Sequence, residues 1–404
     1  YLRRITEGSE QIASSLHDYI IRQIIRRIML RIGRGDEYLI TSSDVWRIKT
    51  LQESGDLLED ITAEIAKYTK RQRKEIKAAM EEAGVKALEA DHKVYQAAGL
   101  SPEPLTQSPA LIRLMERNML ATVNEWTNFT RTTAQAAQAL YITECDLAYN
   151  KVMTGTVSYT QAVREAVDTI VKDGVVVRYP TGHKDTIETA TARAVRTGIA
   201  QATGDICLKR MEEMDWDIIL VSAHVGARTG DGGQNPGNHA WWQGQYFSRT
   251  GKDKRFPDFK ESTGYGTIEG LCGVNCRHSF GSGTGEAKDN PYKDILTEDN
   301  YKVEQAEKRQ RELERRIRKT KRAVLGLQEA VDGCKDEQAK FSLQQKLDRK
   351  SYILQRQNKA YNEYCKDNDL RPLADRLRIA QWSREQATRA RGAARRYENA
   401  KGAD

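Results

Sequence analysis

The chain has 404 residues, of which 30% are charged and 39% are hydrophobic. This length allows two or three domains with cores of their own, and no apolar run approaches the roughly 18 residues that a membrane-spanning helix needs. We therefore expect a water-soluble protein without membrane contact. Six scattered cysteines are too few for a disulfide scaffold and indicate synthesis in a reducing compartment.

The positive charge is concentrated near the C-terminus. The formal net charge is +8, but residues 301–404 contain 27 Lys and Arg against 16 Asp and Glu, whereas the rest of the chain has 38 against 41. Such an asymmetry permits contact with nucleic acid or with an acidic protein surface. A solvated helix face is the alternative, because acidic residues are interleaved throughout.

The first 98 residues contain no proline and predict helices. A first helix is indicated by apolar residues at near-helical spacing: Ile12, Leu16, Ile20, Ile24, Ile28 and Leu30. Ser42 or Ser43 would cap a second helix, whose apolar residues are Val45, Trp46, Ile48, Leu51 and Leu57. Three of the eight prolines fall within residues 99–110 and predict a break between helical blocks.

Two further helices are expected before residue 175. Helical patterning resumes over residues 111–153. In the next helix, Ser158 and Gln161 have the spacing of a capping box, and Gly174 is expected at the end. Its predicted buried face consists of Ala162, Val163, Ala166, Val167, Ile170 and Val171.

Residues 175–285 differ in character from the helical blocks. The compositions of residues 175–180 and 217–223 are typical of strands, and a long helix is expected between them, at about residues 186–214. Glycines in residues 226–238 exclude regular structure there, and residues 281–291 predict a linker. We expect a compact α+β module rich in glycine and aromatic residues.

Heptad spacing dominates the chain beyond Val303. The first run comprises Val303, Ala306, Gln310, Leu313, Ile317, Thr320, Val324, Leu327 and Val331. The second run comprises Leu343, Leu347, Lys350, Leu354, Gln357, Tyr361 and Tyr364. Because a glycine-containing turn near Gly333 separates the runs, they predict an antiparallel coiled-coil hairpin, followed after Pro372 by a basic helical tail.

The predicted fold class is mainly α with a small α+β module. Four consecutive parts are expected along the chain. They are an N-terminal helical domain (1–98), a proline-rich break with a second helical block (99–174), the compact α+β module (175–285) and a basic coiled-coil helical region (286–404).

A possible zinc site lies in the α+β module. Cys272, Cys276 and His278 lie close in sequence, and His239 lies upstream. Two thiolates and two imidazoles are ligands that zinc accepts in a tetrahedral shell, and His224 is a further candidate. The spacing differs from that of standard zinc fingers, so a disulfide and ordinary packed residues remain alternatives.

The sequence carries no strong enzymatic motif. It has no P-loop and no His-Glu-x-x-His sequence, and the glycines of residues 281–286 do not form a dinucleotide-binding pattern. Ser222 and His224 lack an acidic partner and a nucleophile elbow. We therefore expect no catalytic residues.

Two segments have features of nucleic-acid contact. Aromatic and basic side chains that could stack on bases and bind phosphates occur together: Trp241, Trp242, Lys252, Lys254 and Arg255. The arginine-rich residues 307–322 could follow phosphates. We favour the alternatives, which are a packed aromatic core and a solvated or subunit-contacting helix.

Several segments resemble a known phage protein family. The N-terminal half contains LQESGDLLEDITAEIAKYT and AGVKALEADHKVYQAAGLSPEPLTQSPAL. TRTTAQAAQ, RYPTGHKDTIETATARAVRTG and SAHVGAR then lead to WQGQYFSRTGK, FPDF, TGYG and GLCGVNCRHSF, and VEQAEKRQRELERRIRKTKR follows. Together they resemble the phage minor capsid proteins of the "minor capsid protein 2" type, which are related to Mu-type head morphogenesis proteins.

The resemblance implies a structural protein of a tailed phage or prophage-derived particle. It implies action at the portal vertex in head assembly, DNA packaging or ejection, after assembly in the host bacterial cytoplasm. The expected partners are the portal protein and the major capsid protein, with packaged double-stranded DNA as a further candidate. Several copies per virion are expected, and residues 1–98 or the coiled hairpin are expected to contact the portal.

Two alternative functions remain open. Mu-type modules have been likened to ADP-ribosyltransferases, so Arg228 with Glu261 or Glu269 could hold NAD in an enzyme or toxin. This is an analogy at the level of the fold, which does not by itself establish a function. The other alternative is a DNA-binding accessory protein.

Overall fold

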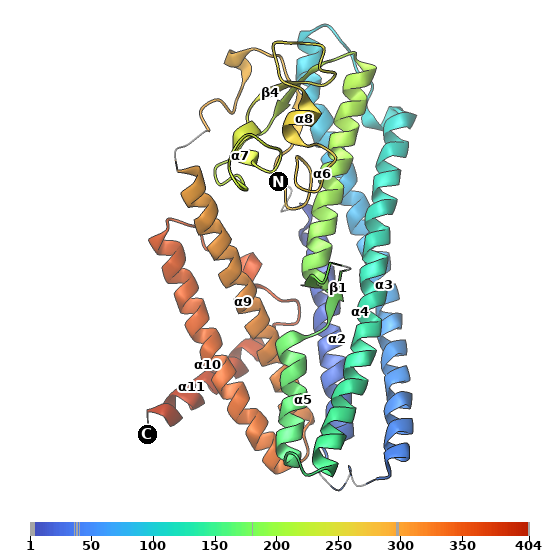
Figure 1. The fold of residues 1–404 in the computed structure, drawn as a ribbon, viewed down its shortest axis with the longest axis vertical. Helices are drawn as coiled ribbons and strands as arrows, with labels where there is room; N and C mark the ends of the chain where they lie inside the picture. Colours follow the sequence, from blue (N-terminus) through green and yellow to red (C-terminus); the bar gives the residue numbers. More distant parts are fainter. Residues whose placement is uncertain are drawn as a thin grey trace. The chain divides into compact units, whose positions relative to one another are not determined.

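The chain folds mostly into helices with two small antiparallel sheets (Figure 1). This computed structural model describes residues 5–35, 37, 39, 41–179, 181–295 and 299–402. It confirms the predicted class, mainly α with small sheets in the middle of the chain and paired helices at its C-terminal end.

Two compact units are built from interleaved segments of the chain. The first unit contains Tyr1–Glu10, Arg71–Trp126 and Thr191–Lys308, and the second contains Gln11–Lys70, Thr127–Ala190 and Arg309–Asp404. Several long helices therefore begin in one unit and end in the other. The four domains expected from the sequence are continuous stretches of chain, whereas these two units combine distant segments. The division into four domains therefore remains a prediction.

Helix α2 (Glu7–Ile32) buries most of its predicted apolar stripe. Ile12 to Ile28 are buried at the expected four-residue steps, but Leu30 is 57% exposed. The inclusion of Leu30 was wrong because two residues rotate the side chain by about 200° around a helix of 3.6 residues per turn. Ile32, which continues the four-residue step, is buried instead.

Helix α3 (Ser43–Ala97) buries a different face from the predicted one. Trp46 and Leu57 are buried as expected, whereas Ile48 and its predicted neighbours Val45 and Leu51 are exposed. The buried positions between Trp46 and Leu57 are taken by Thr50 and Ser54, whose hydroxyls donate to the carbonyls of Trp46 and Leu51. Small hydroxyl residues can be buried in a helix because such bonds satisfy them.

Helices α4 (Pro109–Met153) and α5 (Tyr159–Asp173) follow the proline-rich break, which holds the short 3-10 helix η2 (Leu105–Gln107). Ser158 accepts a hydrogen bond from the backbone N–H of Gln161, and Gly174 ends α5 with φ 58°. The Gln161 side chain donates to Glu165, so only the Ser158 half of the predicted capping box is seen. The predicted apolar face of α5 is buried.

A β-hairpin precedes the long helix α6 (Ile187–Glu213). Strand β1 (Val176–Arg178) pairs in antiparallel fashion with β2 (Lys184–Thr186). The first of these strands was predicted, but β2 was missed. Its sequence, Lys-Asp-Thr, lacks the β-branched and aromatic enrichment that identifies strands.

The second sheet has three strands in the order β4-β3-β5. The central strand β3 (Ile218–Val221) pairs in antiparallel fashion with β4 (Tyr246–Ser248) and with β5 (Phe280–Ser282). Since residues 281–282 belong to β5, the predicted linker at 281–291 was wrong at its start. The rest of that stretch contains the short 3-10 helix η3 (Ala287–Asp289).

Two short helices, α7 (His239–Trp242) and α8 (Phe259–Thr263), lie in the connections of this sheet. The sheet, these helices and α6 share one apolar cluster. It consists of Ala200, Cys207, Met211, Ile219, Val221, Trp242, Phe247, Phe259, Leu271, Cys272, Cys276 and Phe280.

The C-terminal region contains the predicted helix pair. Helix α9 (Asn300–Gly333) and helix α10 (Glu337–Asp367) run in opposite directions around a short turn, where Asp336 caps α10 (Figure 1). A 3-10 helix, η4 (Ala374–Leu377), and helix α11 (Arg384–Lys401) follow, and α11 packs closely on α10. No helix within the described ranges is long and apolar enough to cross a membrane.

A buried ion cluster connects three segments of the second unit. The Arg322 guanidinium donates to Asp18 at 2.8 Å and also pairs with Glu188. The other carboxylate oxygen of Asp18 accepts the backbone N–H of Gln381 at 3.0 Å. Because these groups are withdrawn from water, each depends on the others for its hydrogen bonds.

Candidate metal centre

Three candidate ligands come together beside the three-stranded sheet of the first unit. His239 is the first residue of α7, where the Asn238 side chain caps the helix by accepting the Trp241 N–H. Cys276 and His278 lie in the irregular segment just before β5. Pairing of β5 with β3 fixes the end of that segment, and the cap fixes the start of α7.

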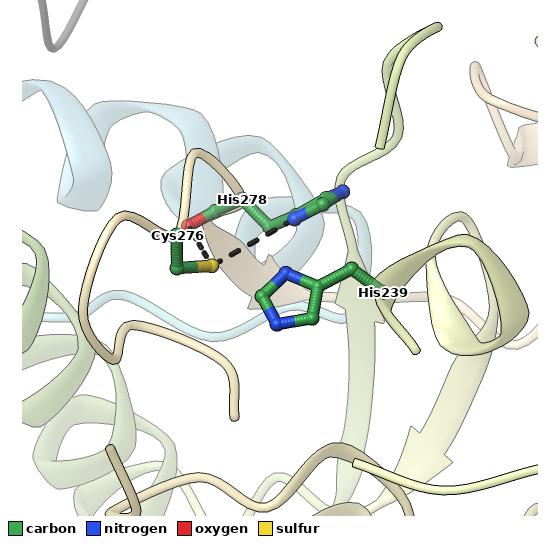
Figure 2. A group of neighbouring side chains, drawn as sticks. All are labelled: His239, Cys276 and His278. Carbon is green, nitrogen blue, oxygen red and sulfur yellow. Dashed lines mark hydrogen bonds between the residues drawn. The ribbon is translucent and has the colours of Figure 1, made fainter. Parts of the chain in front are cut away.

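The ligand atoms of His239, Cys276 and His278 all lie within 4.8 Å of one another. Cys276 Sγ is 3.7 Å from His278 Nδ1, and Figure 2 shows His239 facing this pair from α7. All three residues are buried. Three buried donors that converge on one point have the arrangement of a metal site.

Neighbouring groups determine which imidazole nitrogens face the shared point. His239 Nε2 lies 2.8 Å from the Glu269 carbonyl oxygen, which can only accept, so Nε2 carries the proton. His278 Nε2 lies 3.0 Å from Gln243 Oε1, which also accepts the backbone N–H of His224 at 3.0 Å. Each histidine therefore keeps Nδ1 free of this proton, and Figure 2 shows the two Nδ1 atoms on the side of Cys276. Bonds of this kind orient metal-binding histidines in proteins.

Burial sets the protonation of the three groups. It lowers the pKa of His239 to about 4 and holds the pKa of His278 well below its ordinary value of 6.5. Both imidazoles are therefore neutral near pH 7, as metal ligands must be. Burial raises the pKa of Cys276, so a bound metal would displace the proton of a thiol.

Cys272 lies outside this group of three. It is buried and lines a cavity of about 130 Å³ together with Asp205 and Tyr265. Its φ of 59° is in the left-handed region, as is that of Asn275, so the chain bends between the two cysteines. The structure therefore brings together three of the four ligands predicted from the sequence.

His224 stacks on His278 with 4.4 Å between ring centroids, but it is also outside the group. Its Nδ1 lies 3.0 Å from the Val225 carbonyl oxygen. Gln243 and the Glu269 carbonyl, which orient the ligands, were not predicted from the sequence. Neither has a sequence signal, because one is a common polar side chain and the other is part of the backbone.

The donor set suits zinc. One thiolate and two imidazoles are ligands that zinc prefers, and three protein ligands leave one tetrahedral position for water or another group. The guanidinium of Arg228 donates to the Val274 carbonyl nearby, and its positive charge favours the thiolate form of Cys276 by opposing the rise in pKa that burial causes. The residues therefore fit a zinc ion, and the identity of any bound metal remains a prediction.

Of the residues considered for NAD binding, Arg228 makes a side-chain contact within the module, whereas Glu261 and Glu269 take part through their backbone groups. Arg228 holds the Val274 carbonyl at 3.1 Å, and the Glu269 carbonyl orients His239. Glu261 lies in the first turn of α8, where its backbone N–H is capped by Asp258. Ser222 accepts the backbone N–H of Ser279, so its hydroxyl supports the segment before β5.

The aromatic residues considered for nucleic-acid stacking are largely part of the core. Trp242 is fully buried and donates to the Pro236 carbonyl at 3.0 Å, and Trp241 packs against the apolar cluster. Among the basic residues, Lys254 donates to the Gly251 carbonyl and Arg255 pairs with Asp253. The favoured alternative, a packed aromatic core, is confirmed for Trp242.

The first turns of α9 hold the loop that follows β3. Asn300 Oδ1 accepts the backbone N–H groups of Gly226 and Ala227 at 2.8 and 2.9 Å. Glu304, which is buried, accepts the hydroxyl of Thr229 at 2.8 Å. The loop leads towards His239, so these contacts help to support the candidate metal centre.

Comparison with known proteins gives one family. The family model for phage minor capsid protein 2 matches residues 1–353. Neither a curated protein nor a solved structure shows significant similarity to the chain. The matched range includes the candidate metal centre and the helix pair as far as Ile353.

Proposed function

The chain belongs to the phage minor capsid protein 2 family, and from this premise we propose that it acts at the portal vertex of a tailed phage or prophage-derived particle. There it contacts the portal protein and the major capsid protein and assists head assembly, DNA packaging or ejection. The family match over residues 1–353 is the observation that carries this proposal. The charge of residues 301–404 makes packaged DNA a further candidate partner.

The candidate metal centre supports a structural role better than a catalytic one. His239 and His278 are each 1% exposed, and Cys276 is 9% exposed. A catalytic metal must be accessible to a substrate at its open coordination position. A structural metal, which joins segments of the chain, needs no such access. The burial of the donors therefore favours a structural metal, although structural zinc sites usually have four protein ligands and this group supplies three.

We further propose that His239, Cys276 and His278 hold a zinc ion. Such an ion would join α7 to the segment before β5, two parts of the chain separated by more than 30 residues. It would stabilise the small, irregular sheet module, which has only three short strands. A metal that binds the folded state alone adds its binding free energy to folding.

Portal binding provides a direct test of the proposed role. Purified chain and portal protein from the same phage should form a complex in analytical ultracentrifugation. Charge reversal at exposed positions of α3, with Lys49→Glu as one example, identifies the contact if it weakens the complex. Failure of the portal protein to bind, under conditions in which both proteins are folded, would contradict the portal-vertex proposal.

A further inference from the structure

Helices α9 and α10 border a groove in the second unit that has a volume of about 640 Å³. The residues that line it come from these two helices alone. They are Arg309, Leu313, Arg316, Ile317, Ile353, Arg356, Gln357, Lys359, Ala360 and Glu363.

The opposite side of the helix pair is covered by the chain itself. Gln310 donates to the Arg371 carbonyl at 2.9 Å, and the Tyr361 hydroxyl accepts the Leu373 N–H at 2.9 Å. Residues 371–377 therefore run along that side. On the groove side, the described residues that form the lining belong only to the helices.

The lining of the groove combines apolar and basic side chains. The apolar ones, which we call the floor, are Leu313, Ile317, Ile353 and Ala360, and the basic ones, which we call the rim, are Arg309, Arg316, Arg356 and Lys359. Glu363 is the one acidic residue in the lining, and it pairs with the rim residue Lys359. Glu312 pairs with both Arg309 and Arg316, so a single carboxylate is shared between two guanidiniums. The rim thus retains a positive excess.

The shape and chemistry of the groove favour a helix as its occupant. Arg309–Ile317 and Ile353–Glu363 extend about 12 and 15 Å along their axes at 1.5 Å per residue, which matches two to three helical turns. A helix satisfies its own backbone hydrogen bonds against an apolar floor, whereas a single strand does not. Nucleic-acid phosphates would meet the rim but leave the floor uncovered.

We propose that this groove binds a short, acidic amphipathic helix of a partner protein. Apolar side chains at i, i+3, i+4 and i+7 of the partner occupy the floor, and acidic residues on both flanks meet the basic rim. The lining residues of α9 and α10 have the same helical spacing, so each helix presents one continuous face to the partner.

A defined peptide tests this proposal without knowledge of the natural partner. The probe is a fluorescein-labelled 14-residue helical peptide with leucines at those spacings and glutamates on the flanks. Its affinity for the full chain is measured by fluorescence anisotropy. A peptide of identical composition in scrambled order and a 16-base-pair DNA duplex are measured in parallel.

We expect the amphipathic peptide to bind and the scrambled peptide to bind much more weakly. The Arg316→Glu/Arg356→Glu double variant should weaken binding about tenfold or more, because two attractive rim contacts become repulsive. The matched control, Arg315→Glu/Arg349→Glu, changes exposed arginines of the same helices outside the lining and should shift the affinity less than about twofold. Circular dichroism verifies that both variants are folded.

Several results would overturn the proposal. They are no binding of the amphipathic peptide, equal binding of the scrambled peptide, equal effects of the two double variants, and groove-dependent binding of the DNA duplex. A second measurement uses a photo-crosslinking residue at Gln357 in DNA-filled particles, and this arm rests on the proposed virion role. A crosslink to an acidic helical segment of another protein supports the proposal, whereas a crosslink to a second copy of this chain contradicts it.

Discussion

The metal centre leads to a sharp prediction for two neighbouring cysteines. Cys276→Ser removes the thiolate that faces His239 and His278, whereas Cys272→Ser changes a buried cysteine outside the group. We expect zinc to stabilise the wild-type chain and the Cys272→Ser variant alike. The Cys276→Ser variant should lose most of this zinc-dependent gain, because zinc would retain two of its three protein ligands.

The size of the effect follows from linkage between binding and folding. At a free zinc concentration 1,000 times the dissociation constant, a metal that binds only the folded state adds about 4 kcal/mol. The first unit contains roughly 180 residues by its segment bounds, and for a domain of about that size 1 kcal/mol shifts Tm by about 2–4 °C. The expected increase in Tm on zinc addition is therefore about 8–16 °C.

Differential scanning calorimetry with buffered zinc or with a chelator measures this increase for each protein. Because Cys272 is buried, serine at position 272 lowers the Tm in both conditions, so the comparison concerns the difference between the zinc and chelator conditions. Equal zinc-dependent increases for the Cys276→Ser variant and the wild type would refute the assignment. The assignment would also fail if zinc left the wild-type Tm unchanged.

Three further predictions concern stability. Arg322→Met leaves Asp18 buried without its cation, while Glu188 keeps its pair with Arg318, and should cost about 3–5 kcal/mol in urea unfolding. A loss no larger than that of the exposed control Arg315→Met would contradict the buried cluster. Burial raises the pKa of Asp91 to about 6, against 3.8 ordinarily, so between about pH 4 and pH 6 the native state holds a proton that the unfolded chain has released. The free energy of unfolding should therefore fall as the pH rises through this range, by up to about 3 kcal/mol. Asp91→Asn should remove this pH dependence, and an equal pH dependence in the two proteins would exclude the explanation. Ser158→Ala removes the cap of α5 and should cost about 1 kcal/mol, and an unchanged unfolding midpoint would show that the cap contributes nothing.

Sequence periodicity predicted the elements better than it predicted their buried faces. The stripe of α2 and the apolar face of α5 follow directly from helical spacing. In α3, however, the apolar side chain of Ile48 is exposed while Thr50 is buried. Spacing identifies the faces of a helix, but the neighbouring segments determine which face is covered, and those neighbours are distant in sequence.

The candidate metal centre shows the same limit. Residue types alone identified His239, Cys276 and His278, and they also suggested Cys272. Cys272 stays outside the group of three although it shares a core cluster with Cys276. The left-handed backbone of Asn275 is common for asparagine, but that of Cys272 has no signal in the sequence. Gln243 orients His278 through its side-chain oxygen, which also accepts the backbone N–H of His224. These three residues meet only in the folded chain, so their contact could not be predicted from the sequence.

The central claim, that this family member is a minor component at the portal vertex, is tested most directly by quantitative mass spectrometry of purified, DNA-filled particles. The chain is compared with the portal and major capsid proteins of the same particles. We predict a reproducible ratio at or below the copy number of the portal protein. Absence from the particles, or a ratio close to that of the major capsid protein, would contradict the account.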